Sequence, residues 1–309
     1  MILISSSTFD VSTNKVIDWI LSIDYEQKII RVNDDSNYQI KFDKKDIIIL
    51  IDETAINIES IKSFWYRRGR IRYKLKDTVT FNTNIKEDEE KVLEEYINFV
   101  LKKKRHINDY FNSEPNKLIV LEEAKKIGFS IPESYVCQDR ESVLKINYDK
   151  EIITKTFLGP SMILFEDKTS VIYTEIISKK NIPKYFSPSL FQDKIEKKYE
   201  LRIFYFDGKF WSMAIFSQLD SKTSVDFKQY KHENPNRTVP YKLPKNIEMK
   251  LKKLILKLQY NCCSIDMIVT LKNEFVFLEI NPIGQFGMIS IPCNYHFEKE
   301  IANFLMYES

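Results

Sequence analysis

The stretch EFVFLEINPIGQFG, residues 274–287, decides the fold of this chain. Its apolar run is typical of a strand buried on both faces, yet the run carries Glu279 and Asn281 before a Pro-Ile-Gly turn ends it. Oxygen-bearing side chains inside an apolar strand cost free energy unless a partner compensates them. The sequence therefore predicts that this strand holds a polar ligand.

The segment SIDMIVTLKNEFVFLEIN, residues 264–281, reads as two strands that meet at Lys272-Asn273. If the loop has two residues, or four, antiparallel pairing places Asp266 directly opposite Glu279. The Cβ atoms of such partners lie roughly 4.5–5.5 Å apart. Asn281 lies two residues beyond Glu279 and points to the same face, so the three side chains are expected to converge.

Two like charges in an apolar sheet need a positive partner, and neither strand of this hairpin carries an arginine. Magnesium takes oxygen ligands and is usually held by one or two carboxylates together with substrate phosphates. The hairpin is thus predicted to bind Mg²⁺, and with it a phosphorylated substrate. The alternative is that the hairpin is an edge and that one carboxylate faces solvent.

A phosphorylated substrate also needs cations that hold its phosphates. The sequence has neither G-x-x-x-x-G-K-[ST] nor G-x-G-x-x-G, so a different phosphate-binding fold is required. Lys155 lies in the β-branched run EIITKTF, where it either snorkels from an edge or points into a cleft. Arg202, in ELRIF, has the same two interpretations, but its planar guanidinium suits phosphate or carboxylate.

Composition excludes several function classes. The 309 residues carry a formal net charge of only +3 with interspersed signs, which argues against nucleic acid as a partner. No stretch approaches the length of a membrane span, and the first residues do not form a secretory signal, so a cytoplasmic protein is expected. The four cysteines form no C-x-x-C pair and the three histidines are scattered, which disfavours disulfides, zinc and a Ser-His-Asp triad.

The order of parts along the chain resembles that of ATP-grasp ligases: a lysine before a helix, a strand lysine, ELR, an aspartate strand and EINP. More closely, the segments SLFQDKIEKKYELRIFYFDGKFWSMAIFSQ, VDFKQY, NPNRTVPYKLP and EINPIGQFG resemble the ligases that modify ribosomal peptides of the graspetide (microviridin-like) class. FWYRRG and GMISIPCNYHFEKEIA resemble the grasp-with-spasm subgroup. The resemblance covers nearly the whole chain and is densest from Ser189 onward.

This resemblance implies a mixed α/β and α+β chain with the ATP-grasp fold. An N-terminal α/β pre-ATP-grasp domain at 1–112 would precede a small central lobe at 113–188 and a C-terminal lobe at 189–309, and the two lobes would clamp ATP. The implied ATP contacts are Lys117 and Lys155 on the phosphates, Gln192, Asp193, Lys194 and Ile195 along the adenine, and Glu200 as a hydrogen-bonding or ribose-binding acid. The implied Mg²⁺ ligands are Asp266, Glu279 and Asn281.

The implied reaction is ATP-dependent activation of a Glu or Asp side chain of a precursor peptide as an acyl phosphate. A Ser or Thr hydroxyl or a Lys amine of the same peptide then closes an ester or amide crosslink, and ADP and phosphate are released. Arg202 would lie against the γ-phosphate, and Arg237 would contact the same phosphoryl group or the incoming carboxylate. Because protein groups mainly position reactants and compensate charge in such chemistry, no covalent nucleophile is required.

The peptide side of the site is less well defined. Arg67 and Arg68 follow two aromatic residues and would grip an acidic peptide, or form an ordinary surface pair. Asp226 begins a long polar loop that would cover the site. The chain departs from the microviridin pattern at Ile283, usually polar, and at Phe286, usually Trp, which puts the peptide contacts in doubt.

Two alternatives stay open. One is an ATP-grasp ligase that joins free amino acids or modifies a protein terminus. The other is a nucleotide-sensing or peptide-binding protein without turnover, which predicts that a metal or phosphate residue is missing, and none is. The resemblance also implies a leader segment on the precursor peptide and a homodimer.

Overall fold

The computed structural model describes residues 1–33, 38–42, 46–51, 54–69, 83–146, 151–157, 161–165, 168–172, 174–178, 182–218 and 236–307. The chain forms two compact units. The first comprises Met1–Ser113, Tyr260–Cys262 and Pro282–Ser309, and the second comprises Glu114–Gln259 and Cys263–Asn281. The C-terminal residues after Asn281 thus return to the N-terminal unit. The separate central and C-terminal lobes stay a prediction.

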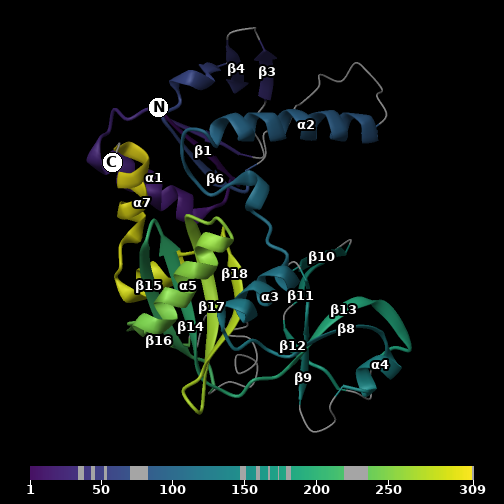
Figure 1. The fold of residues 1–309 in the computed structure, drawn as a ribbon. Helices are drawn as coiled ribbons and strands as arrows, with labels where there is room; N and C mark the ends of the chain where they lie inside the picture. Colours follow the sequence, from purple (N-terminus) through teal and green to yellow (C-terminus); the bar gives the residue numbers. More distant parts are fainter. Residues whose placement is uncertain are drawn as a thin grey trace. The chain divides into compact units, whose positions relative to one another are not determined.

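The first unit is built on a parallel sheet with the strand order β2-β1-β6-β7. Its strands are β1 (Ile2–Ser6), β2 (Ile29–Val32), β6 (Ser63–Arg67) and β7 (Arg105–Ile107). Helix α1 (Val11–Ile23) joins β1 to β2, and α7 (Phe297–Met306) packs against it (Figure 1). The Ser63 hydroxyl donates to the Leu305 carbonyl at 2.6 Å, which ties the C-terminal helix to β6.

A three-stranded antiparallel sheet extends this unit, with β3 (Tyr38–Phe42), β4 (Ile47–Ile51) and β5 (Thr54–Asn57). Its other elements are α2 (Thr83–Leu101), α6 (Gly287–Cys293) and the short 3₁₀ turns η1 (Ile58–Ser60) and η2 (Tyr110–Asn112). Apolar side chains from both sheets, from α2 and from the segment before α6 form one core that includes Leu3, Ile49, Phe64, Ile97 and Ile283. Ile283, which departs from the microviridin pattern, is therefore a buried core residue.

The second unit contains an antiparallel five-stranded sheet with the order β16-β15-β14-β17-β18. Its strands are β14 (Lys197–Phe206), β15 (Lys209–Phe216), β16 (Arg237–Tyr241), β17 (Cys262–Thr270) and β18 (Phe275–Asn281). Asp207 and Gly208 form the turn between β14 and β15, and both residues have positive φ, as a tight hairpin turn requires.

In this unit, the helices α3 (Lys117–Ile127) and α5 (Lys245–Lys257) pack against each other. Helix α3 ends at Gly128, whose φ of 95° forms a left-handed cap. The Lys250 ammonium donates to the Gly128 carbonyl at 2.6 Å, so the end of α3 is held by α5.

A second antiparallel sheet in this unit has the order β12-β9-β13-β8. Its elements are β8 (Ser134–Asp139), β9 (Ile152–Lys155), β12 (Glu175–Ile176), β13 (Tyr185–Asp193) and the short helix α4 (Arg140–Leu144). The neighbouring runs EIITKTF, SMILFED and SVIYTEII do not all belong to this sheet. β10 (Ser161–Phe165) and β11 (Lys168–Ile172) pair with each other as a separate two-stranded sheet.

The turn of the carboxylate hairpin differs from the prediction. Backbone hydrogen bonds from Thr270 N–H to the Glu274 carbonyl and from Asn273 N–H to the Thr270 carbonyl, both 2.9 Å, close a three-residue loop, Leu271–Asn273. Asn273 has a φ of 61°, the left-handed conformation that such loops require. The predicted loop of two or four residues is therefore wrong.

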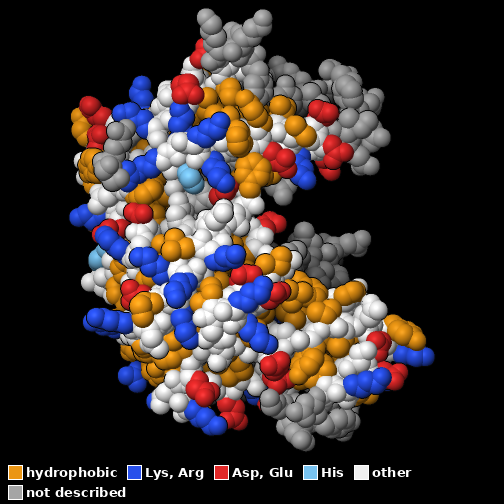
Figure 2. Space-filling view, viewed as in Figure 1, with side chains coloured by type: hydrophobic (Ala, Val, Ile, Leu, Met, Phe, Trp, Pro, Cys, Tyr) orange, Lys and Arg blue, Asp and Glu red, His pale blue; other side chains and the backbone are white. Residues whose placement is uncertain are grey.

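The surface carries both charge signs. Figure 2 shows Lys and Arg side chains spread over the visible face together with Asp and Glu side chains, as the sequence predicts. In the described part of the chain, no helix is long and apolar enough to cross a membrane.

Candidate active site

The predicted pairing of the two carboxylates is confirmed. Asp266 on β17 lies directly opposite Glu279 on β18, and Ser264 lies opposite Asn281. Residues two apart on a strand share a face, and paired residues do too. Two carboxylates, an amide and a hydroxyl therefore occupy one patch on one face of the five-stranded sheet.

Two cations from neighbouring elements compensate these carboxylates. Arg202 on β14 donates from Nη1 to Asp266 Oδ1 at 2.6 Å, and both side chains are buried. Lys117, the first residue of α3, has its Nζ 3.5 Å from Glu279 Oε2. The hairpin itself carries no arginine, so the sequence predicts a metal ion as the source of the compensating charge. In the folded chain, the adjacent strand and helix supply it.

Lys117 also connects the five-stranded sheet to the sheet that contains β9. Its ammonium donates to the Thr156 carbonyl at 3.0 Å, directly after β9. The preceding residue, Lys155, ends β9 opposite Leu190 and is half-buried. Both lysines predicted to reach phosphates therefore belong to elements that meet beside Glu279.

Glu200 is a second buried acid on β14. Being two residues before Arg202, it lies on the same strand face. Its Oε1 pairs with the Lys197 ammonium and accepts from the Ser217 hydroxyl at 3.1 Å. The sequence does not predict this contact of Lys197. It is one of two adjacent lysines in IEKKYELR, and a lysine at the start of a strand gives no signal of its own.

The predicted adenine segment lies at the end of β13. Gln192 is 1% exposed, and its Nε2 donates to the Ser134 hydroxyl at 2.8 Å, while its Oε1 has no hydrogen-bond partner within the protein. Asp193 is buried, Lys194 pairs with Glu151 at 2.5 Å, and Ile195 is half-buried in the link to β14. A buried acceptor without a partner suits a ligand that brings its own N–H donor.

Arg237 stands apart from the carboxylates. It begins β16, the edge strand two positions from β14, and pairs with Phe216 on β15. Its side chain is exposed, with the guanidinium carbon 5.4 Å from the centre of the Phe216 ring. No described contact brings it to Asp266 or Glu279. Asp226, expected in the covering loop, lies outside the described residues.

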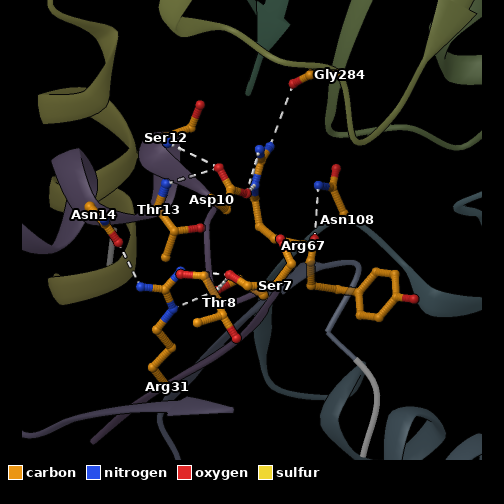
Figure 3. A network of polar contacts seen from close by, with 12 residues as sticks. Ser7, Thr8, Asp10, Ser12, Thr13, Asn14, Arg31, Arg67, Asn108 and Gly284 are labelled. Carbon is orange, nitrogen blue, oxygen red and sulfur yellow. Dashed lines mark hydrogen bonds and ion pairs between the residues drawn. The ribbon is translucent and has the colours of Figure 1, made fainter. Parts of the chain in front are cut away.

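The two predicted peptide-binding arginines have different environments. Arg67 is 2% exposed, and its Nε and Nη2 both lie 2.8 Å from Asp10 Oδ2 (Figure 3). Its Nη1 lies 3.5 Å from the Gly284 carbonyl, and the rings of Trp65 and Phe286 flank it. Arg68 is exposed and has a φ of 71°, which is uncommon for a residue with a side chain.

The donor set at the hairpin fits magnesium. Within the described ranges, no cluster of three or more His, Cys, Asp or Glu side chains is arranged to hold a metal alone. Two carboxylates and one amide are the kind of partial oxygen set that Mg²⁺ completes with phosphates and water. The Ser264 hydroxyl, 1% exposed and without a hydrogen-bond partner, leaves room for a further polar partner at the same place.

Comparisons with known proteins show what the chain is similar to. No family model and no curated protein matches the sequence. Among solved structures, the chain is similar to the macrocyclase MdnC from Microcystis aeruginosa, bound with the precursor peptide MdnA. The TM-score is 0.78 at 25% identity, and the match covers 98% of each chain.

Two further structures share the fold. A RiPP-associated ATP-grasp ligase from Chryseobacterium gregarium, in complex with ADP and a leader and core peptide, matches with a TM-score of 0.80 and 23% identity over 98% of this chain and 96% of that chain. The ATP-grasp ligase PsnB, complexed with a phosphomimetic precursor variant, Mg and ADP, matches with a TM-score of 0.72 and 13% identity over 99% and 97%. The predicted ATP-grasp fold and the resemblance to graspetide ligases are confirmed.

Proposed function

We propose that this chain is an ADP-forming ATP-grasp ligase that crosslinks side chains of a ribosomal precursor peptide. A Glu or Asp carboxylate of the peptide takes the γ-phosphoryl group of ATP, which gives an acyl phosphate and ADP. A Ser or Thr hydroxyl or a Lys amine of the same peptide then attacks the acyl carbon, loses its proton and displaces phosphate. The product is an ester or amide crosslink.

One observation carries this proposal: the paired carboxylates Asp266 and Glu279 lie between Arg202 and Lys117 in a chain with the fold of peptide-bound ATP-grasp ligases. When bound, Mg²⁺ would neutralise phosphate charge during the transfer. Asp266, Glu279 and Asn281 would hold it. Arg202, beside them, would stabilise charge that develops on the transferred group.

The remaining roles follow from placement. Lys117 and Lys155 are assigned to the phosphates because their elements meet beside Glu279. Gln192 to Ile195 are assigned to the adenine, with the Gln192 Oε1 as an acceptor for an amino group. Glu200 is assigned to a hydrogen bond with the nucleotide. Arg237, exposed on the edge strand, is assigned to the incoming peptide carboxylate rather than to the transferred phosphoryl group.

On the peptide side, the two adjacent arginines of the N-terminal unit are assigned different roles. Arg68 is exposed and is assigned to acidic side chains of the peptide, and Asp226 is assigned to other groups of the peptide. Arg67 is already paired with Asp10 and is assigned to the fold. A leader segment on the peptide and a homodimer complete the proposal, and sedimentation velocity of the purified protein tests the dimer.

The test is co-expression with a Glu- and Thr-rich precursor peptide encoded beside the gene, followed by mass spectrometry. Each crosslink removes one water, so the expected product is lighter by whole waters while ADP accumulates. Glu279→Gln is expected to lower ADP formation by at least about a hundredfold. Glu274→Gln, in the exposed turn of the same hairpin, is the matched control and should keep full activity.

The alternative enzyme gives a different result in the same experiment. ADP release with single free amino acids, and no dehydration of the precursor peptide, would favour a ligase for free amino acids or for a protein terminus. Undiminished turnover by Glu279→Gln would remove the assigned metal role.

A further inference from the structure

A β-bulge lies directly beside the carboxylate pair. Met267 pairs with Phe277, but the next pair is Asp266 with Glu279, so Leu278 has no partner on β17. Consecutive residues of β17 point to opposite faces, and Glu279 therefore shares the face of Asp266 while Phe277 shares that of Met267. In a regular strand, Phe277 and Glu279 would lie on the same face.

The turn explains why the extra residue is needed. The three-residue loop Leu271–Asn273 fixes the pairs Val269–Phe275 and Met267–Phe277. Continued without interruption, this register would place Leu278 opposite Asp266. Glu279 and Asn281 would then turn to the Phe277 face, because a one-residue slip reverses every side chain.

The chain is anchored on both sides of the bulge. Before it, Phe277 is fully buried, its ring centre lies 5.7 Å from that of Phe129, and its N–H donates to the Ser130 carbonyl at 2.9 Å. After it, Glu279 lies 3.5 Å from the Lys117 ammonium. The change of face is therefore completed within a single residue.

We infer that the bulge at Leu278 positions Glu279 and Asn281 for the metal, an inference that rests on the proposed function. Bulges bend a strand, increase its twist and re-aim side chains beside active sites. The effect belongs to the backbone, since Leu278 itself is only half-buried. The residues after the bulge face Asp266 and Ser264, whose hydroxyl has no partner in the protein.

Deletion of Leu278 tests this inference because it removes the bend and keeps the pairing. Phe277 would still face Met267, and Glu279, now its neighbour, would still face Asp266 in a regular ladder. We expect the deletion variant to fold and its Mg²⁺ affinity to fall about 10–100-fold, as when groups that orient metal ligands are lost. Leu278→Ala keeps the bulge and should bind Mg²⁺ as the wild type does.

The readouts are calorimetric titration of Mg²⁺ into protein saturated with ADP and the Mg²⁺ dependence of ADP formation. The expected signature is a raised half-saturating Mg²⁺ concentration with a nearly unchanged KM for the peptide. Wild-type affinity and turnover in the deletion variant would overturn the inference and leave the proposed function standing. Absence of both Mg²⁺ and ADP binding by the wild type would overturn the two together.

If the deletion variant does not fold by circular dichroism, Leu278→Gly and Leu278→Ala decide the question. Both keep the extra residue, but glycine loosens the backbone at the bulge. A half-saturating Mg²⁺ concentration several-fold higher for the glycine variant than for the alanine variant supports a positioning role. Equal values for the two variants overturn it.

Discussion

Two buried Arg–Asp ion pairs, one in each unit, look alike and have different surroundings. Arg67–Asp10 and Arg202–Asp266 span 2.8 and 2.6 Å, and all four side chains are nearly inaccessible. Asp10 also caps α1 by accepting from the Ser12 and Thr13 amides. Asp266 instead faces the second carboxylate, Glu279.

The difference shows that distance and burial do not identify a functional ion pair. Arg67 is surrounded by Asp10, Gly284 and two aromatic rings from its own unit, so its charge is used within the fold. Arg202 lies beside two adjacent carboxylates, an arrangement with electrostatic repulsion that a bound cation would relieve. The neighbours on the same sheet face are what distinguish the pair at the proposed site.

The largest expected effect is on the pair in the N-terminal unit. Arg67→Met should lower the free energy of unfolding by about 3–5 kcal/mol, because Asp10 is left buried without its partner. Urea unfolding followed by tryptophan fluorescence measures this, since Trp65 stacks against Phe286 beside the pair. Mg²⁺ and ADP should not restore the loss. A change below about 1 kcal/mol would mean that the pair is not structural.

Arg202→Met should cost less, about 1–3 kcal/mol, because Lys117 remains beside the carboxylates. Unlike the first variant, it should regain much of this stability when Mg²⁺ and ADP are added, as the cation replaces the lost charge. Thermal unfolding with and without Mg²⁺ and ADP checks this. Arg202→Lys, which keeps the charge, is the control. Equal behaviour of Arg67→Met and Arg202→Met in Mg²⁺ would erase the distinction between the pairs.

Two buried serines are expected to differ in how much they contribute to stability, and this effect is smaller. The Ser63 hydroxyl donates to Leu305, whereas the Ser264 hydroxyl has no partner. Ser63→Ala should therefore cost about 1 kcal/mol, while Ser264→Ala should be close to neutral without ligand. Denaturant midpoints of the two variants measure the difference. A larger loss from Ser264→Ala would show that its hydroxyl already has a structural role.

The smallest expected effect on stability at neutral pH is that of replacing Cys262. Burial raises the pKa of this thiol from about 9 to about 12, against the lowering influence of the Arg67 charge. The unfolded chain then releases the proton first, so stability present below pH 9 should decline as pH rises towards 12. Cys262→Ala should leave stability at pH 7 nearly unchanged and reduce this decline. Unfolding curves at pH 7 and pH 10 test the sign.

Much of the carboxylate site is predictable from the sequence because it is local. Asp266 and Glu279 lie on strands joined by one turn, so pattern alone brings them together. The predicted pairing of Asp266 with Glu279 is right although the predicted loop length is wrong. The loop has three residues, and the extra residue Leu278 shifts the register by one, which restores the pairing. An apolar residue within an apolar strand gives no signal that it is the unpaired one.

The cations could not be assigned to their partners in the same way. The contact of Arg202 with Asp266 depends on β14 and β17 being neighbours, and the contact of Lys117 with Glu279 depends on where α3 begins over the sheet. Likewise, the sequence suggests no difference between Arg67 and Arg68. Arg67 is the last residue of β6, a strand that is buried along its whole length, and it pairs with the distant Asp10, whereas Arg68 lies just beyond the strand.

The return of the C-terminus to the first unit has a consequence for biosynthesis. Helix α7 packs against α1, and Leu305 accepts the hydrogen bond from Ser63. During translation, the N-terminal sheet therefore emerges first but lacks α7 until the residues after Asn281 have followed. The second unit ends at Asn281 and is complete earlier. Ribosome-bound chains truncated after Asn281 are thus expected to resist proteolysis in the second unit before the first.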